Sequence, residues 1–174
     1  MATIYNLFKF IEDKKPQYKP PFKVKLIYNP NSLTKEELNV EGDLDLSNAP
    51  IQSLPDNLKV KGSLYLYSTP IQSLPNGLTV RRNLNLYNTS IQLLPNDLTV
   101  KGDLNLSNTL IQSLPNDLEV GRSLYLSNTP IQLLPNDLKV RGNLWLRDTP
   151  LSEKYTEEEI KAMAPGVKGN IYLK

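Results

Sequence analysis

A sequence repeat of constant length constrains the fold of this chain more than any other feature. The pair Leu-Pro and a valine each recur every 20 residues without slippage, at Leu54-Pro55, Leu74-Pro75, Leu94-Pro95, Leu114-Pro115 and Leu134-Pro135, and at Val40, Val60, Val80, Val100, Val120 and Val140. A fixed period of this length is typical of solenoids, in which each unit buries its apolar side against its neighbours. We therefore expect a coiled fold whose core is shared by successive units.

The pattern within one unit predicts how that unit folds. The run Ser63-Leu64-Tyr65-Leu66-Tyr67 alternates polar and apolar residues as a half-buried strand does, and Leu58-Lys59-Val60 indicates a second, shorter strand. Gly62 lies between them and suits a bend with positive φ, although arginines stand at that place in two other units. Because prolines recur in the returning segment, a long helix is excluded there. The expected fold is mostly β: a solenoid with a parallel sheet, irregular or 3₁₀ returns, and short helices only at the two caps.

Stacking of the units also predicts columns of equivalent side chains. A threonine column and a glutamine column run through the repeats, at Thr69, Thr89, Thr109, Thr129 and Thr149, and at Gln52, Gln72, Gln92, Gln112 and Gln132. Stacked amides can hydrogen-bond to one another, as they do in cross-β structures. We interpret the glutamine column as structural; the alternative is a regular binding surface.

One unit resembles a known repeat family. Leu64-x-Leu66-x-x-Thr69-x-Ile71-x-x-Leu74-Pro75 is similar to the leucine-rich repeat, with Thr in place of the usual Asn, and resembles most the short repeats of uncharacterised bacteriophage and bacterial proteins. The match covers residues 38 to about 151. The resemblance implies a binding scaffold of a kind whose partners are diverse. Thr lacks the amide that bonds the loop backbone in that family, and the unit has one extra residue before its strand. Both a curved horseshoe and a flattened β-solenoid therefore stay open.

The repeat divides the chain into three parts. Residues 1–37 form an N-terminal cap, residues 38–151 the repeats, and residues 152–174 a C-terminal cap. In the first cap we expect a helix over residues 3–14, a proline-rich connector and a strand at Phe22–Tyr28. In the last cap, Thr156 and Glu159 form a capping box that opens a helix, and Pro165-Gly166 ends it. Residues 167–173 then repeat the strand pattern.

The composition excludes several kinds of chemistry. The chain has no His and no Cys, which excludes disulfides, thiolate nucleophiles, zinc sites built on these residues and a Ser-His-Asp triad. Carboxylate pairs such as Asp43 and Asp45 lie on the open side of a strand without a cleft. We therefore expect no enzyme activity, no cofactor and no metal. No run approaches the roughly 20 apolar residues that span a bilayer, and the N-terminus lacks signal-peptide features, so we expect a cytoplasmic protein without a membrane partner.

Aromatic residues on the solvent side of the main strand are the leading candidate site: Tyr65, Tyr67, Tyr87, Tyr125, Trp145 and Tyr172. Exposed Tyr and Trp are common anchors of protein interfaces, so we expect a protein partner. Carbohydrate or surface recognition by a phage or bacterial component is the alternative, because these rings also stack on sugars. A purely structural interpretation is that aromatic residues favour strands and cover their neighbours.

A basic ridge is the second candidate, for nucleic acid or an acidic partner: Lys61, Arg81, Arg82, Lys101, Arg122 and Arg141. Against it, Lys+Arg number 20 and Asp+Glu 18, a net charge of only +2, and aspartates recur on the return segments. A homodimer through the C-terminal edge strand Gly169–Lys174 is a further hypothesis, because an uncovered edge can pair with another chain. The alternative is that water and Lys174 solvate this edge.

Overall fold

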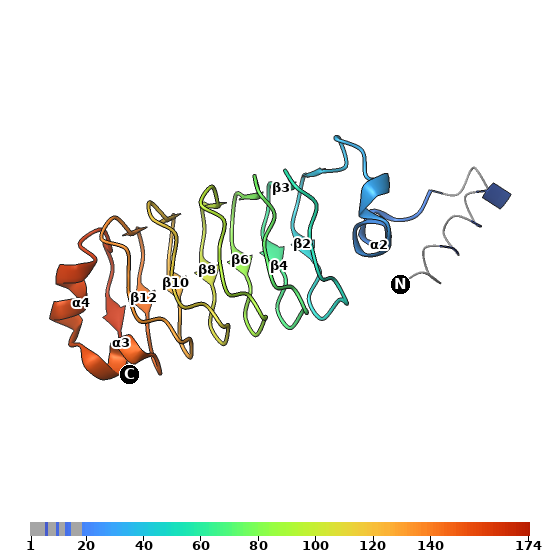
Figure 1. Cartoon of the computed structure of the whole chain (residues 1–174). Helices are drawn as coiled ribbons and strands as arrows, with labels where there is room; N and C mark the ends of the chain where they lie inside the picture. Colours follow the sequence, from blue (N-terminus) through green and yellow to red (C-terminus); the bar gives the residue numbers. More distant parts are fainter. Residues whose placement is uncertain (1–5, 7–9, 11–12, 15–18) are drawn as a thin grey trace.

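Each repeat unit forms one coil of a parallel β-solenoid (Figure 1). The computed structural model describes residues 6, 10, 13–14 and 19–174. Equivalent strands of successive coils pair in parallel at an offset of 20 residues, as Val60 pairs with Val80 and Leu64 with Leu84. The predicted mostly β solenoid is confirmed, and each of these units has a second strand, but the two strands are equal in length at two residues each.

The strands form two sheets that run the length of the solenoid. The valine sheet has six strands: β1 (Asn39–Val40), β3 (Lys59–Val60), β5 (Thr79–Val80), β7 (Thr99–Val100), β9 (Glu119–Val120) and β11 (Lys139–Val140). The leucine sheet has seven: β2 (Leu44–Asp45), β4 (Leu64–Tyr65), β6 (Leu84–Asn85), β8 (Leu104–Asn105), β10 (Leu124–Tyr125), β12 (Leu144–Trp145) and β13 (Ile171–Tyr172).

The core is the inside of the coils, as the repeat predicts. In a central coil the side chains of Leu104, Leu106 and Ile111 are all 0% exposed. The same positions are buried in the other coils, so the aliphatic residues of one coil pack on those of the next. Removal of this surface from water is the main stabilising contribution.

The threonine column closes the turn that follows each leucine-sheet strand. Thr109 Oγ1 donates a hydrogen bond to the carbonyl oxygen of Leu106 at 2.6 Å, and the bond recurs at Thr69, Thr89, Thr129 and Thr149. The residue before each of these threonines has a positive φ, 57° at Asn108, which Asn and Asp tolerate better than other non-glycine residues. Gly62, for which the sequence suggested a positive φ at the bend between the two strands, does not have one.

A second polar column lies between the two strands of each coil. Its side-chain oxygens accept the backbone N–H of the equivalent residue in the next coil; Ser123 N–H donates to Asp103 Oδ1 at 2.9 Å, for example. We call it the corner ladder: Asp43, Ser63, Asn83, Asp103, Ser123, Asn143 and Asn170. The predicted glutamine bonding is not found, because the glutamines are exposed and no hydrogen bond joins them in the described residues.

At the N-terminal end the predicted strand at Phe22–Tyr28 is wrong. This segment is helix α2 (Phe22–Tyr28), followed by the 3₁₀ turn η1 (Pro30–Ser32). Leu26 is 1% exposed, and Phe22, four residues earlier, packs against the same core, so the buried residues follow helical spacing. The short alternation of Lys and Val concealed that spacing. The predicted helix over residues 3–14, including its apolar positions, falls mostly outside the described residues.

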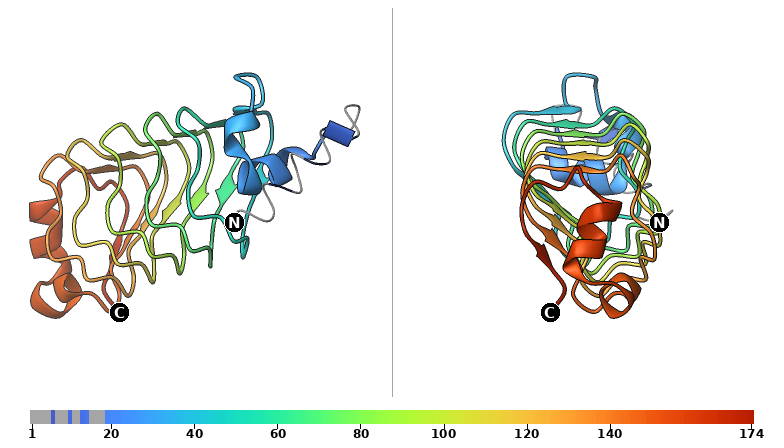
Figure 2. Two further views of the ribbon diagram at one scale, coloured as in Figure 1. Left: turned by 45° about the vertical axis from the view of Figure 1, so that its right-hand side comes forward. Right: turned by 90° about the vertical axis from the view of Figure 1, so that its left-hand side faces the viewer.

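The C-terminal cap contains one more helix than predicted. Helix α4 (Glu157–Met163) opens at the expected capping box, with Glu159 N–H donating to Thr156 Oγ1 and Thr156 N–H to the Glu159 carboxylate. Helix α3 (Pro150–Lys154) was missed; its N-cap is Thr149, the last threonine of the column. Leu151 and Ile160 are buried against the last coil. Figure 2 shows both helices beside β13 at the end of the solenoid.

A truncated core residue in a central coil should be costly. Leu104→Ala should lower the free energy of unfolding by about 2–5 kcal/mol, because neighbouring coils cannot collapse into the cavity. Urea denaturation followed by circular dichroism measures the change. Gln112→Ala, at an exposed position of the next turn, is the matched control and should be near neutral. Equal effects of the two substitutions would contradict the shared core.

The corner ladder predicts a smaller, specific loss. Asp103→Ala removes the acceptor of the Ser123 N–H and should cost about 1 kcal/mol. Asp103→Asn keeps an acceptor oxygen, as Asn83 and Asn143 do in other coils, and should retain wild-type stability. The urea midpoints of the two variants measure the difference. If Asp103→Asn lost as much stability as Asp103→Ala, the charge of Asp103 rather than its hydrogen bond would be the stabilising feature.

Candidate binding surface

One residue of each leucine-sheet strand faces solvent, and these residues align in a column. Backbone pairing places them in the order Asp45, Tyr65, Asn85, Asn105, Tyr125, Trp145 and Tyr172. This is the column that the alternation predicts. The rigid spacing of the parallel strands, about 4.8 Å, therefore sets the spacing of the side chains.

Three consecutive members of the column form an aromatic stack: Tyr125, Trp145 and Tyr172. The ring centroids of Tyr125 and Trp145 are 5.8 Å apart with planes at 10°, and those of Trp145 and Tyr172 are 4.0 Å apart with planes at 18°. Stacked rings stabilise one another beyond the area they bury. Both faces of the indole are covered by its neighbours, so the stack presents outward its ring edges and the outer faces of its two tyrosines.

Among the described residues, the indole nitrogen of Trp145 has no hydrogen-bond partner. Its Nε1 atom is buried and unpaired within the part of the chain that the structure describes. A buried donor without an acceptor carries a free-energy cost. The stack therefore keeps Trp145 in place through ring contacts rather than through a polar anchor.

The other aromatic residues lie at the opposite end of the same face. Tyr67 and Tyr87 occupy adjacent coils and are 37% and 41% exposed, whereas Tyr65 is partly buried. Unlike the aromatic stack, these three rings make no ring-to-ring stacking contact among the described residues. The structure thus brings the six predicted residues to one face but divides them into a stacked group and an open group.

Asparagines separate the two aromatic groups. Asn85 Oδ1 accepts the N–H of Tyr87, and Asn105 Oδ1 accepts the N–H of Ser107, each at 3.0 Å. These local bonds tie the amides to their own strands. The middle of the face is therefore polar and occupied with backbone bonding, and the aromatic surface lies toward its two ends.

The basic ridge forms an edge of the solenoid just after the valine sheet. All six predicted residues are exposed, and four of them align in one column through N–H bonds to valine carbonyls of the preceding coil: Lys61, Arg81, Lys101 and Arg141. Gly121 interrupts that column between Lys101 and Arg141. Arg82 and Arg122 lie at the next position of their own coils. The structure places these residues along one edge, but not as an unbroken row of cations.

Acidic side chains reduce the positive charge near this edge. Lys61 Nζ pairs with Glu41 at 2.9 Å, and Lys139 pairs with Glu119 at 2.6 Å on the neighbouring strands. The hydrogen bond between Lys139 and Glu119 lowers the pKa of the Glu119 carboxyl and raises the pKa of the Lys139 ammonium group. Both pairs are solvent-exposed, so they contribute little to stability, but they partly neutralise the surface.

Sequence reasoning missed three exposed leucines on the return segments. Leu93, Leu110 and Leu133 are 68%, 51% and 72% exposed. Each stands where other units carry Ser or Pro, and this departure from the repeat is the signal that could have revealed them. They lie on the return segments rather than in the aromatic column, and none of the described residues covers them.

Other kinds of site find no support in the described residues. No group of acidic residues there could hold a metal ion. Within those residues, no helix combines the length and the apolar character needed to cross a membrane.

The family models give no match to the chain, and neither do the curated proteins. The assignment of a site therefore depends on the geometry of the solvent-facing column and of the basic ridge.

Proposed function

We propose that this protein is a non-catalytic binding scaffold that holds a protein partner against the outer face of the leucine sheet. The observation that carries the proposal is the aromatic stack of Tyr125, Trp145 and Tyr172 on that face. The proposal extends to a leucine-rich-repeat type of solenoid, similar to short repeats of bacteriophage and bacterial proteins, and to action in the cytoplasm.

Rigidity of the face supports this function. The strands from β4 to β12 are fixed by main-chain bonds to both neighbouring coils, and β13 is bonded to β12. The rings of the stack restrain one another. A partner therefore meets a preformed surface and loses little free energy to ordering it. Tyr and Trp edges combine apolar area with polar groups, the mixture that protein interfaces use at their anchors.

The stacking geometry disfavours a carbohydrate at Trp145 itself. A sugar ring packs on an open aromatic face, and Tyr125 and Tyr172 cover both faces of the indole. The outer faces of the two tyrosines stay open, so carbohydrate recognition there is the alternative function. Nucleic acid is disfavoured for a separate reason, because the basic ridge is interrupted at Gly121 and Lys61 is paired with Glu41.

Substitutions that other coils already tolerate test the site. We expect Tyr125→Asn combined with Trp145→Asn to keep the fold, because Asn85 and Asn105 occupy the same column, and to abolish capture of the protein partner. Affinity capture from host lysate, with identification of the retained material, is the measurement. Tyr67→Ser with Tyr87→Ser tests the open group separately, since Ser107 and Ser127 stand at that position in other coils.

Charge reversal on the ridge is the matched control. Arg81→Glu with Arg141→Glu should leave capture of the protein partner unchanged. If this variant instead lost the captured material, and if that material were nucleic acid whose binding fell steeply with salt, the ridge would be the binding site and our proposal would be wrong.

The single tryptophan provides a direct probe of contact. Trp145 is the only Trp in the chain and lies in the middle of the aromatic stack. We expect the captured partner, once purified, to reduce acrylamide quenching of its fluorescence, because the partner would exclude solvent from the ring edge. Unchanged quenching in a saturated complex would contradict contact at the stack.

A further inference from the structure

The return segments form a third side of the solenoid, between the end of each leucine-sheet strand and the start of the next valine-sheet strand. In a central coil, Ile91 and Leu94 are buried at 0% and 8% exposure, whereas Gln92 and Leu93 between them are exposed. The repeat puts equivalent residues at the same places in the other coils. We call this side the return face; it consists of residues 50–57, 70–77, 90–97, 110–117 and 130–137.

The return face carries all three large aliphatic side chains that are exposed among the described residues. Leu93 and Leu133 occupy the same position in two coils that are separated by one coil. Leu110 belongs to the coil between them, and its N–H donates to the carbonyl oxygen of Ile91, two residues before Leu93, at 3.1 Å. Single exposed leucines are ordinary, but a group of them on one face marks an interaction surface.

The coil itself does not require these leucines. Ser53, Ser73 and Ser113 stand at the position of Leu93 and Leu133 in the three other coils, and they are exposed there. A leucine held in water where a serine fits equally well leaves apolar surface whose burial against another molecule is favourable. The departure from the repeat therefore points to a contact outside the solenoid.

Charge on the return face is negative and confined to one margin. Its five segments contain no Lys or Arg. The acidic residues stand at the end of each segment that leads into the valine sheet: Asp56, Asp97, Asp117 and Asp137. The columns that contain Gln92 and Leu93 carry no charge in any coil, so apolar and amide contacts must hold an occupant over them.

The glutamine column makes the uncharged part of the face complementary to itself. Each amide has both donor and acceptor groups, and each of the five glutamines is exposed and without a hydrogen bond to another glutamine among the described residues. A second glutamine column can satisfy both kinds of group, as amide ladders do between paired sheets. Leucine likewise packs on leucine, so an identical face matches this one residue by residue.

The aspartates select how two such faces align. A two-fold axis along the solenoid brings each coil against the same coil of the second copy and leaves the two aspartate margins on opposite sides of the joint. A two-fold axis across the solenoid brings the margins together, and like charges oppose association. Lys139 lies near Asp117 and Asp137 but is paired with Glu119 at 2.6 Å, so repulsion between the margins persists. The parallel arrangement is therefore favoured.

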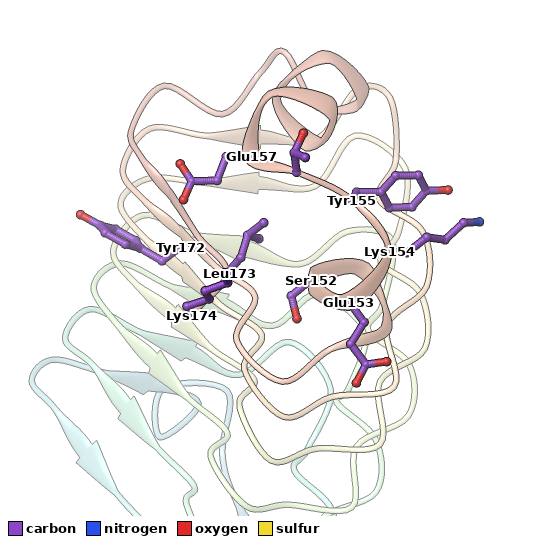
Figure 3. Close-up of a pocket in the computed structure, with 9 residues that line it drawn as sticks. Ser152, Glu153, Lys154, Tyr155, Glu157, Tyr172, Leu173 and Lys174 are labelled. Atoms are coloured by element: carbon purple, nitrogen blue, oxygen red, sulfur yellow. The ribbon is translucent and has the colours of Figure 1, made fainter.

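The groove at the C-terminal end is a weaker candidate, because its lining carries charges of both signs. It measures about 600 Å³ and lies between β13 and the segment 152–157. Glu153 and Glu157 line it together with Lys154 and Lys174 (Figure 3). No occupant follows from such a lining, whereas the return face is uncharged over its leucines and matches a second copy.

We propose that the return face joins two copies of the chain, side by side and in parallel, with Leu93 and Leu133 each packed on its equivalent in the second copy. The face offers about fifteen exposed residues, fewer than the roughly 20–30 per side of a standard interface, so the joint is weak and reversible. The aromatic stack lies on a different side of the coil and stays exposed in both copies. The inference is independent of the proposed function.

Sedimentation equilibrium of the full chain tests the joint. We expect a reversible dimer at concentrations up to about 1 mM. Leu93→Ser with Leu133→Ser should weaken it about a hundredfold, because four leucines lose their contacts in each dimer, and should keep the fold, because serine stands there in other coils. Tyr67→Ser with Tyr87→Ser removes two exposed apolar side chains from the other face and should leave the dimer unchanged.

Cysteine cross-linking tests the alignment, since the chain has no cysteine of its own. The variants Gln92→Cys and Gln132→Cys are mixed and oxidised, and peptide mass mapping identifies the joined positions. The parallel arrangement predicts links from 92 to 92 and from 132 to 132, because equivalent residues face each other within the distance that a disulfide spans. Thr99→Cys, on the valine sheet, is the control for chance collisions and should stay unlinked.

Three results would overturn the inference. The chain could be monomeric at every concentration, or it could form a dimer that Leu93→Ser with Leu133→Ser does not weaken, which would place the joint elsewhere, for example at the strand Gly169–Lys174. A link from 92 to 132 alone would show the two copies antiparallel. None of these results would affect partner capture by the aromatic stack, which the Tyr125 and Trp145 variants test.

Discussion

The structure depends on one constraint: each coil must lie in register on the next. A main-chain ladder and an aliphatic core both cross every coil boundary, and neither can form within one coil alone. The corner ladder adds a side-chain acceptor at each boundary, from Asp43 to Asn143. The stability of such a solenoid is the sum of the contacts at the boundaries between coils. Backbone groups that would bond a further coil therefore lack that partner at the two ends.

In-register stacking also aligns equivalent surface residues in columns, and these columns form the candidate binding surfaces. Positions that face inward are nearly constant, whereas the outer position of the leucine sheet changes from Asp45 through Asn85 to Trp145. Aromatic rings at neighbouring coils become a stack because the coil spacing is close to a stacking distance. The same spacing brings the ridge cations close together, and the partners Glu41 and Glu119 reduce charge repulsion nearby.

The 20-residue period predicts most of the fold, because a residue that recurs at this period must occupy the same position in every coil. The strands, the buried positions and the solvent-facing column all follow from it, and Thr156 with Glu159 predicts the last helix. Features that do not recur with the period are harder to predict from the sequence. Phe22–Tyr28 is too short for its helical spacing to stand out from alternation, and α3 uses Thr149, a residue that the repeat had already explained. Bonds that join equivalent residues, as at Asp103 and Ser123, need coordinates to be seen.

The residues of the candidate site could be predicted from the sequence, but the way their rings are arranged could not. Sequence placed six aromatic residues on one face, yet only coordinates separate the stack at Trp145 from the open pair at Tyr67 and Tyr87. The C-terminal end is similar: the half-repeat indicates the strand β13, but the groove beside it depends on how α3 and α4 pack.

Disulfide trapping in this cysteine-free chain tests the register most directly. Thr79 and Thr99 are paired on neighbouring strands of the valine sheet, and Glu119 lies one strand further along the same column. The account predicts that Thr79→Cys with Thr99→Cys forms an intramolecular disulfide under mild oxidation, because adjacent strands fall within the distance that a disulfide spans. Thr79→Cys with Glu119→Cys, two strands apart, should stay reduced. Equal trapping of the two pairs would contradict the in-register stack.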